Sequence, residues 1–370
     1  DDGPPLAWKT EGIGIGFSSV SVVGDKVFTM GDVKPDCFLF ALDRAKGKKL
    51  WELKVGKTGG SYEGPRCTPT VDGDLVFALG QFGDLVCATV KDGKEVWRKN
   101  LPSDFGGQTG AWNFTESPTI DGDRLIVSPG GSKAAMVALD KKTGKQVWAG
   151  ATPKGGETGY SSAVIANLGG VKQYVRLMAG GLVSFDAKDG KMLWQYGTDG
   201  KRFAGNTANI PTPIVSGDHV FAAAGYGRGA ALLKVTKSGD KFAVEEVYWK
   251  PELKNKHGGV ILVGDKLYGD LDDSGKPWCA NLKTGEILWQ RSGGKGGGSA
   301  SLTAAEGKLY IRYSDGWVVL ADANADKYTE ISSFKVPNGK NNTWAHPVVL
   351  DGKLYVRERD TLWVYNVAAK

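Results

Sequence analysis

One short motif recurs along this chain and restricts the folds that are open to it. A glycine and a lysine are followed, three residues after the lysine, by a tryptophan in the segments that end at Trp51, Trp97, Trp148 and Trp194. These tryptophans recur about every 46 to 51 residues, and repeats of about 40 to 50 residues built from short strands are typical of β-propeller blades. The motif therefore predicts a ring of similar blades.

Three further copies depart from the motif. Trp289 follows Gly285 and Glu286 instead of glycine and lysine, the fifth copy ends at Trp249 after an irregular stretch, and the seventh ends at Phe334 in place of tryptophan. We expect the aromatic residue of each copy to lie on the outermost strand of its blade and to pack between neighbouring blades.

Each repeat also contains an Asp-Gly or Gly-Asp pair between two runs of alternating apolar residues, as in residues 70–77 and 349–355. Such a pair is a strong short-range signal for a β-hairpin, because its glycine supplies the positive φ that a tight turn requires. A second turn, of the form Asp-x-x-(Thr/Asp)-Gly-Lys, precedes the strand that carries the tryptophan. Each repeat therefore predicts four antiparallel strands.

The two ends of the chain complement each other. Residues 347–367 supply three strands of a last repeat and no fourth, whereas residues 6–9 form an isolated strand that carries Trp8, one period before Trp51. We therefore predict an all-β fold, a single eight-bladed propeller in which the N-terminal strand completes the C-terminal blade. Residues 1–370 are expected to form this one domain.

Composition makes several classes of protein improbable. The chain has 47 basic and 41 acidic residues, and its lysines lie mostly in turns rather than in a basic groove with aromatic residues, so we expect no nucleic-acid partner. No apolar run reaches the roughly 18 residues of a membrane helix, so no transmembrane segment is expected. The 4 cysteines form no Cys-x-x-Cys pair, and we expect them to be buried free thiols rather than zinc ligands.

The first residues, Asp1-Asp2-Gly3-Pro4-Pro5, are compatible with the mature end of a processed chain. We accordingly expect an exported, periplasmic protein whose signal peptide has been removed. We expect it to be a monomer.

The loops that join one repeat to the next differ most between repeats, and a propeller gathers them on one face around its central channel. Aromatic walls with a few convergent polar groups are typical of a ligand pocket. The alternative, that these side chains only plug the channel and bond to blade backbones, remains open. The candidate binding residues on this face are Tyr62, Arg66, Trp112, Glu116, Tyr160, Asn209, Tyr226, His257, Trp344 and His346.

Two acidic loops have oxygen-bearing side chains at alternate positions, a spacing that suits Ca²⁺. The first offers Asp270, Asp272 and Ser274, and the second offers Asp322, Asn324 and Asp326. His257, His346 and Glu116 could also bind a metal, but the two histidines belong to blades that are not neighbours. No nucleophile motif, phosphate-binding loop or pair of catalytic carboxylates is present, so no catalytic residue is predicted.

The pattern Ala-Leu-Asp-x-x-Thr-Gly-Lys-x-x-Trp, clearest at residues 138–148, resembles the pyrroloquinoline-quinone (PQQ)-type propeller repeat, and the resemblance covers essentially the whole chain. Residues 64–74, 257–265 and 344–349 are further similar to short PQQ-like repeat proteins of planctomycetes and related bacteria. The superfamily includes an eight-bladed lipoprotein scaffold of outer-membrane assembly that is similar in length. The resemblance thus implies an exported, non-catalytic propeller that binds a protein, a glycan or a small ligand on its loop face.

The superfamily also includes quinoprotein dehydrogenases, which hold PQQ and Ca²⁺ over the propeller axis and are usually longer. This chain lacks the adjacent cysteines and the haem-binding Cys-x-x-Cys-His of those enzymes. The alternative hypothesis is therefore a minimal PQQ- and Ca²⁺-dependent oxidoreductase acting on alcohols or sugars. In that hypothesis Trp112 or Trp344 stacks on the quinone, Arg66 pairs with its carboxylates, Glu116 and Asn209 bind Ca²⁺, and His257 or His346 acts as the base.

Overall fold

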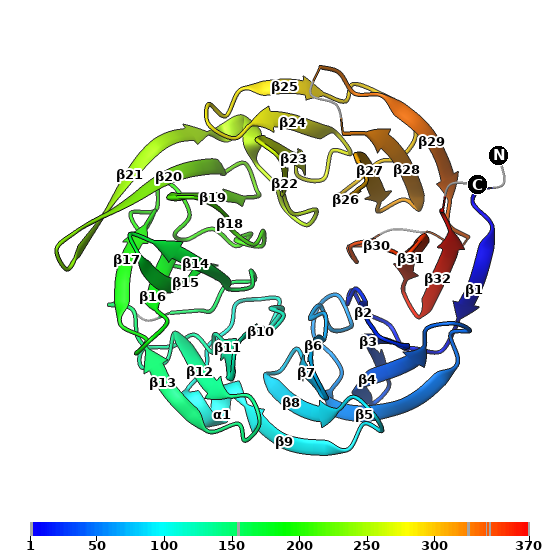
Figure 1. The fold of residues 1–370 in the computed structure, drawn as a ribbon, viewed down its shortest axis with the longest axis horizontal. Helices are drawn as coiled ribbons and strands as arrows, with labels where there is room; N and C mark the ends of the chain where they lie inside the picture. The colour runs from blue at the N-terminus through cyan, green and yellow to red at the C-terminus, as the bar shows by residue number, and fades with distance from the viewer. Residues whose placement is uncertain (1–2, 154–155, 324–325, 338, 340–341, 369–370) are drawn as a thin grey trace.

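The chain forms eight four-stranded antiparallel sheets arranged as the blades of a ring, as expected from the repeats (Figure 1). The structure, a computed structural model, describes residues 3–153, 156–323, 326–337, 339 and 342–368. Successive strands of each blade run from the channel outward, so the third strand lies next to the outermost one. The eight-bladed all-β propeller is thereby confirmed.

The strands of the first four blades follow one another along the chain. Blade 1 contains β2 (Ser21–Val23), β3 (Lys26–Val33), β4 (Asp36–Asp43) and β5 (Lys49–Lys57). Blade 2 contains β6 (Thr70–Asp72), β7 (Leu75–Leu79), β8 (Asp84–Thr89) and β9 (Glu95–Asn100), followed by the short helix α1 (Leu101–Phe105). Blade 3 contains β10 (Thr119–Asp121), β11 (Arg124–Val127), β12 (Met136–Asp140) and β13 (Gln146–Gly150), and blade 4 contains β14 (Val164–Leu168), β15 (Val171–Met178), β16 (Gly181–Asp186) and β17 (Met192–Tyr196).

The remaining blades repeat this order. Blade 5 contains β18 (Ile214–Ser216), β19 (His219–Ala224), β20 (Gly229–Ser238) and β21 (Lys241–Lys250), followed by the 3₁₀ turn η1 (Pro251–Leu253). Blade 6 contains β22 (Ile261–Val263), β23 (Lys266–Asp270), β24 (Pro277–Asn281) and β25 (Ile287–Gln290), and blade 7 contains β26 (Ala300–Ala305), β27 (Lys308–Tyr313), β28 (Trp317–Asp322) and β29 (Glu330–Lys335). Blade 8 contains β30 (Val348–Leu350), β31 (Lys353–Glu358), β32 (Thr361–Asn366) and β1 (Leu6–Thr10).

The ring is closed by the strand nearest the N-terminus. β1 pairs antiparallel with β32, so that Trp8 lies opposite Val364 and Thr10 opposite Leu362 (Figure 1). The prediction that the N-terminal strand completes the last blade is confirmed. Closure removes the open end that an unfinished eighth blade would leave, and so protects the edge of β32.

The recurring glycine and tryptophan make one contact between neighbouring blades. Trp51, on the outer strand of blade 1, donates its indole N–H to the Val90 carbonyl of blade 2 at 3.2 Å. Gly93 of blade 2 has a φ of 71°, and a Cβ at this position would lie 2.5 Å from Trp51 Cε3. Where this contact forms, the tryptophan needs the bare backbone of the next turn, which explains why glycine recurs there. The same contact joins Trp8 to Gly47, Trp97 to Gly144 and Trp148 to Gly190. Trp194 differs, because its indole N–H donates to the Gln173 side chain of its own blade at 2.8 Å.

Two irregular copies differ from the sequence alignment. In blade 5 the residue that follows the β-bulge on the outer strand, the place of Trp51 in blade 1, is Tyr248 rather than Trp249. The Tyr248 hydroxyl donates to the Leu282 carbonyl of blade 6 at 2.9 Å. In blade 7 the corresponding residue is Ser332, and Phe334 lies two residues further along the strand. The β-bulge adds one unpaired residue to each outer strand. Aligning the repeats on their aromatic residues does not show where along the strand this extra residue lies. Phe334 still packs between blades 7 and 8, against Gly3 and Tyr365.

Serine and threonine side chains tie the innermost strands together around the channel. The backbone N–H of Ser19 donates to Thr68 Oγ1 at 3.2 Å, that of Thr68 donates to Ser117 Oγ at 3.0 Å, and that of Ser117 donates to Ser162 Oγ at 2.9 Å. Ser162 continues the series to Thr212 Oγ1 at 3.2 Å. These residues precede β2, β6, β10, β14 and β18, so the series links the inner edges of five consecutive blades.

Two further expectations concern burial and the membrane. Cys37, Cys67, Cys87 and Cys279 are buried free thiols, as expected. Among the residues that the structure describes, no helix is long and apolar enough to cross a membrane.

The contact between Trp51 and Gly93 predicts that Gly93→Ala is more destabilising than a comparable change in an open turn. Gly122 provides the control, because its φ is 60° and a Cβ there would meet nothing within 4 Å. Both alanines carry the cost of left-handed backbone, but only that at residue 93 also collides with an indole. We expect Gly93→Ala to lower the free energy of unfolding by about 1–3 kcal/mol more than Gly122→Ala, measured by urea unfolding. Equal losses would contradict the contact.

Candidate functional site

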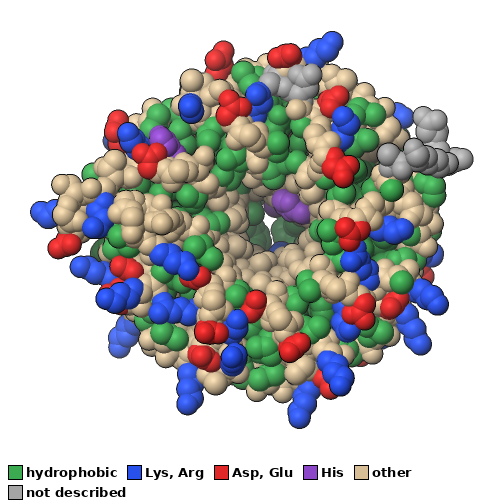
Figure 2. Space-filling model, in the orientation of Figure 1, with side chains coloured by type: hydrophobic (Ala, Val, Ile, Leu, Met, Phe, Trp, Pro, Cys, Tyr) green, Lys and Arg blue, Asp and Glu red, His purple; other side chains and the backbone are tan. Residues whose placement is uncertain are grey.

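The loops between blades enclose a pocket on the propeller axis. The pocket has a volume of about 280 Å³, and the ring is hollowed at its centre (Figure 2). Its lining comes from the segments that precede the inner strands of blades 1 to 6 and blade 8, and from the turn between β19 and β20. The lining residues are Phe17, Ser19, Tyr62, Arg66, Thr68, Trp112, Thr115, Ser117, Tyr160, Ile210, Thr212, Tyr226, Lys256, His257, Trp344 and His346.

Eight of the ten residues predicted for this face line the pocket. The two exceptions are Glu116 and Asn209, which are buried behind it. Sequence reasoning missed Phe17 and Lys256. Phe17 stands in the loop before the first inner strand, so the rule that identified the other loops could also have identified it.

One side of the pocket is a stack of rings that we call the Trp344 wall, formed by Phe17, Tyr62, His257 and Trp344. The Trp344 ring stacks on His257 at a centroid distance of 4.1 Å and on Phe17 at 4.6 Å. Tyr62 leans against the same indole at 5.3 Å. These residues come from four different loops, so the stack brings together segments far apart in the sequence.

A second cluster, the Trp112 wall, consists of Trp112, Tyr160 and Tyr226. The ring of Trp112 lies 5.2 Å from that of Tyr160 and 6.2 Å from that of Tyr226. The ammonium group of Lys256 sits 4.4 Å from the centre of the Tyr226 ring, a cation–π contact. The pocket thus lies between two aromatic walls.

His257 is held by Asp273 of blade 6 and Ser299, which precedes the first strand of blade 7. Its Nδ1 lies 3.1 Å from Ser299 Oγ and 3.4 Å from Asp273 Oδ1, and Asp273 also pairs with Lys256 at 2.5 Å. The hydrogen bond from His257, aided by Lys256, lowers the pKa of Asp273, whereas burial lowers the pKa of His257. Burial also lowers the pKa of His346, so both histidines are neutral at pH 7. His257 is therefore fixed in orientation as a wall of the pocket.

Two tyrosines at the mouth adopt a backbone conformation that bulky residues rarely use. Tyr62 has a φ of 58° and Tyr226 a φ of 53°, and both side chains are about half exposed. Tyr226 precedes Gly227, which has a φ of 75°, and Arg228 N–H donates to the Gly225 carbonyl at 3.3 Å. Positive φ at both central residues defines a type I′ turn, whose first central position favours Asn, Asp or Gly. A large side chain there carries strain of the kind found at ligand clamps.

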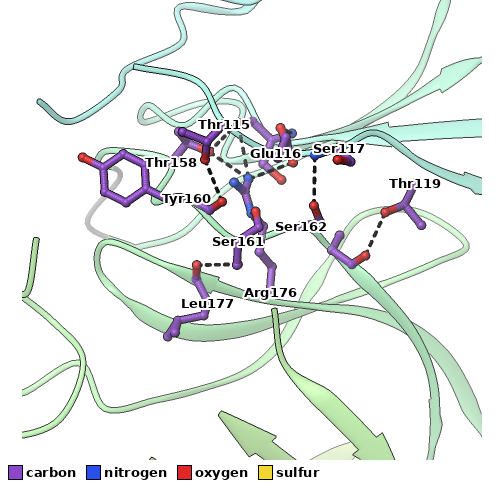
Figure 3. Close-up of polar contacts among 12 residues, drawn as sticks. Thr115, Glu116, Ser117, Thr119, Thr158, Tyr160, Ser161, Ser162, Arg176 and Leu177 are labelled. Atoms are coloured by element: carbon purple, nitrogen blue, oxygen red, sulfur yellow. Dashed lines mark hydrogen bonds and ion pairs between the residues drawn. The ribbon is translucent and has the colours of Figure 1, made fainter. Parts of the chain in front are cut away.

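Glu116 stabilises the fold beneath the pocket. Its carboxylate lies 3.2 Å from Arg176 Nη1 and accepts the Ser128 N–H at 2.7 Å, and both ionic side chains are 1% exposed (Figure 3). Arg176 also donates to the Ser161 carbonyl and to the Thr158 hydroxyl, each at 2.8 Å. This buried pair connects blade 3 to blade 4. Burial raises the pKa of Glu116, while the charge of Arg176 opposes that effect.

Asn209 and Arg66 are also bonded to the protein backbone. The Asn209 amide donates to the carbonyls of Met178 at 2.8 Å and Phe203 at 3.0 Å. Arg66 donates to the carbonyls of Ser61 at 3.0 Å and Tyr62 at 2.8 Å, and so holds the loop that presents Tyr62. The sequence analysis left open that some of these side chains only bond to the backbone rather than bind a ligand. That alternative describes Asn209 and part of the role of Arg66.

The first acidic loop does not direct its side chains to one point. Asp270 accepts the Ala300 N–H at 2.9 Å, Asp272 accepts the Gly227 N–H at 3.3 Å, and Ser274 donates to the Leu271 carbonyl at 2.5 Å. Burial raises the pKa of Asp270 to about 7. Within the described ranges, no group of three or more His, Cys, Asp or Glu side chains is placed to hold a metal ion. In the second loop, Asn324 lies outside the described residues.

Comparison with known proteins places the chain in a family. The family described as outer membrane protein assembly factor BamB matches residues 38–291, which is more than half of the chain. The chain belongs to this family. Its PQQ-like repeat, expected from the motif, is thereby confirmed.

Individual BamB relatives are distant. The BamB of Shewanella oneidensis is 25% identical over 257 residues, which cover 65% of this chain and 60% of the relative. The BamB of Burkholderia pseudomallei is 24% identical over 261 residues, which cover 66% of this chain and 59% of the relative. The chain thus matches about three fifths of the length of these relatives.

Solved structures agree on the fold alone. BamB from Moraxella catarrhalis has a TM-score of 0.64 at 17% identity, with 97% of each chain covered. The quinohemoprotein alcohol dehydrogenase of Comamonas testosteroni has a TM-score of 0.68 at 13% identity, covering 99% of this chain and 76% of the enzyme. An assembly factor and an oxidoreductase therefore share this architecture, so the fold does not decide between the two hypotheses.

The residues proposed for a calcium-bound quinone do not fit that group. Glu116 neutralises Arg176 and Asn209 is bonded to two backbone carbonyls, and neither side chain lines the pocket. Releasing Glu116 would leave a buried arginine without its counter-charge, which is costly. The BamB-family fold of this chain thus lacks the two ligands on which the quinoprotein hypothesis depends.

The buried pair predicts that Glu116→Ala destabilises the fold by about 3–5 kcal/mol, because the Arg176 charge would remain buried and unpaired. Glu157→Ala is the control, since Glu157 is exposed on the same loop face. Urea unfolding with and without Ca²⁺ measures the effect. A loss that appears only in the presence of Ca²⁺ would show instead that Glu116 binds the ion.

Proposed function

We propose that this chain is an exported, non-catalytic binding propeller that takes up a protein, a glycan or a small ligand at its loop face. The observation that carries the proposal is the axial pocket between two aromatic walls, built from loops that differ from blade to blade. Membership of the BamB family, whose described members are outer membrane protein assembly factors, supports a binding role in the cell envelope.

The polar groups of the pocket favour binding over chemistry. His257 is stacked and hydrogen-bonded, Lys256 is paired with Asp273, and Arg66 is bonded to loop carbonyls. A general base must reach the proton that it removes, and a nucleophile needs such a base beside it. In this pocket His257, Lys256 and Arg66 instead hold the rings of the two aromatic walls in place.

The size of the pocket indicates what enters it. Ligand pockets usually span about 300–1,000 Å³, so a pocket of about 280 Å³ suits one ring or one side chain. A folded protein would need about 800 Å² of contact on each partner, and would therefore extend over the surrounding loops while inserting a single group. A small ligand and a protein partner would therefore both place a group between the same two aromatic walls.

Removing one wall should weaken binding without unfolding the ring. We expect Trp112→Ala, in the immobilised chain, to retain much less of the material that the unaltered chain captures from an envelope extract, because the ring of the second wall is lost. Val147→Ala, on the exposed outer rim, is the control and should capture normally. Titration with PQQ and Ca²⁺ should leave the quinone absorbance unchanged. Equal capture by Trp112→Ala and the unaltered chain would refute the proposed site.

The strained turn gives a sharper test. Tyr226→Asn places a favoured residue in the type I′ turn, so we expect equal or greater stability in urea unfolding together with weaker ligand capture. Tyr226→Phe keeps both the ring and the strain and should capture nearly as well as the unaltered chain. Weaker stability of Tyr226→Asn with normal capture would mean that the tyrosine serves the fold.

A further inference from the structure

Positive charge collects on one side of the axial pocket. Arg66, Arg357 and Arg359 surround the Trp344 wall, and among the described residues none of them lies within ion-pair distance of a carboxylate. On the opposite side, Lys256 is already paired with Asp273 at 2.5 Å. The two walls therefore differ in charge although both are aromatic.

Arg357 and Arg359 border a second cavity, which we call the annex, whereas Arg66 lines the axial pocket. It has a volume of about 200 Å³ and shares Phe17, Tyr62 and Trp344 with the axial pocket, so the two spaces adjoin across the Trp344 wall. Arg359 lines the annex, is exposed, and has a φ of 53°. Arg357 lies beneath it, 2% exposed.

Arg357 and Arg66 hold their charges against neutral oxygens. Arg357 donates to the Thr29 hydroxyl and, at 2.8 Å, to the Gly14 carbonyl. Burial lowers the pKa of Arg357 to about 10 and that of Arg66 to about 10. The carboxylates of Asp32 and Asp360 attract these charges from a greater distance, but neither arginine has a carboxylate within ion-pair distance among the described residues. Buried charges in proteins are normally paired directly, so these two guanidinium groups leave room for an anion nearby.

The acidic groups in the neighbourhood offset this charge only in part. Glu63 lines the annex but pairs with Lys34 at 2.9 Å. Asp32 is buried and accepts a hydrogen bond from the Gln81 amide at 3.1 Å, and although burial raises its pKa to about 6, its negative charge acts on both Arg66 and Arg357. Asp360 acts on Arg357 in the same way, so two carboxylates stand against the three guanidinium groups of Arg66, Arg357 and Arg359. The annex thus keeps an excess of positive charge.

The floor of the axial pocket offers hydroxyl groups. Thr68 lines it and accepts the Ser19 N–H through its oxygen, which leaves the proton of its hydroxyl available to donate. Ser117 also lines it, but its hydroxyl already bonds to the Cys67 sulfur. Aromatic faces beside hydroxyl donors match a ring whose faces are apolar and whose edge carries oxygen atoms. A sugar ring has these properties.

We propose that the ligand of this pocket is an acidic carbohydrate, whose ring lies between the two aromatic walls and whose carboxylate faces the arginines of the annex. The inference rests on the proposed binding function and names its ligand class. A carboxylate accepts charge-assisted hydrogen bonds from arginine, which are stronger than those between neutral groups. A neutral sugar would leave the excess charge of the annex without a partner.

An oligomer of galacturonic acid and its methyl ester test this inference, because the ester keeps the ring and removes the charge. We expect the acid to quench tryptophan fluorescence at a concentration about tenfold lower than the ester. Arg359→Gln should weaken binding of the acid by about tenfold and leave the ester unchanged. Lys142→Gln, which removes one charge from an exposed turn on the opposite face, is the control and should change neither.

The outcomes separate this inference from the proposed function. Tighter binding of the acid that depends on both Arg359 and Trp112 supports the acidic carbohydrate. Equal binding of acid and ester overturns it, as does binding of PQQ in the absence of any binding of the acid. If no carbohydrate binds while capture from the extract still depends on Trp112, the binding function stands and the ligand class is wrong.

Discussion

A tryptophan that packs on a glycine of the next blade sets the distance between neighbouring blades in this ring. The indole fills the gap between outer strands, and its N–H bonds to a carbonyl of the adjoining turn, as in the 2.9 Å contact from Trp97 to Lys141. A side chain at the facing glycine would occupy the same space. The contact is made by Trp8, Trp51, Trp97 and Trp148, so a local motif of five residues sets the distance between the blades that these residues join.

Closure at the rim has a consequence at the axis. Once the blades are spaced, their inner strands lie near enough for serine and threonine hydroxyls to bridge them, as from Thr68 to Ser117 at 3.0 Å. The channel wall is thus built from backbone and short side chains, which leaves the loops above it free to vary. Loops on a rigid scaffold commonly carry function, and here they place the aromatic walls over the channel. Two of their tyrosines accept a left-handed backbone, a cost that the rigid ring can bear.

The sequence predicted most of the fold because the repeat reports its own period. It also predicted most of the pocket, since the topology of a propeller brings the variable loops together. The sequence-based prediction was wrong where the outcome depends on which way a side chain points rather than on which loop it belongs to. Glu116 and Ser117 are adjacent, yet the carboxylate points into the blade junction toward Arg176 while the hydroxyl lines the channel. Likewise a one-residue bulge decides between Tyr248 and Trp249. No sequence motif marks Arg357 and Arg359 as site residues. They come to lie beside the loops of blade 1 only because the ring closes and brings blade 8 next to blade 1.

The blades and the loops of this chain serve different purposes, because the blades form a fold that proteins of different roles share. An assembly factor and a quinohemoprotein dehydrogenase share this fold, so the fold cannot select a ligand. Selection must come from groups that the scaffold does not need. Glu116 with Arg176 serves the scaffold, since each satisfies the charge of the other. Arg357 and Arg359 differ in this respect, because no carboxylate of the described chain pairs with them. A charge that has no carboxylate within ion-pair distance and lies beside a cavity is costly to a protein that binds nothing, and it is useful to one that binds an anion.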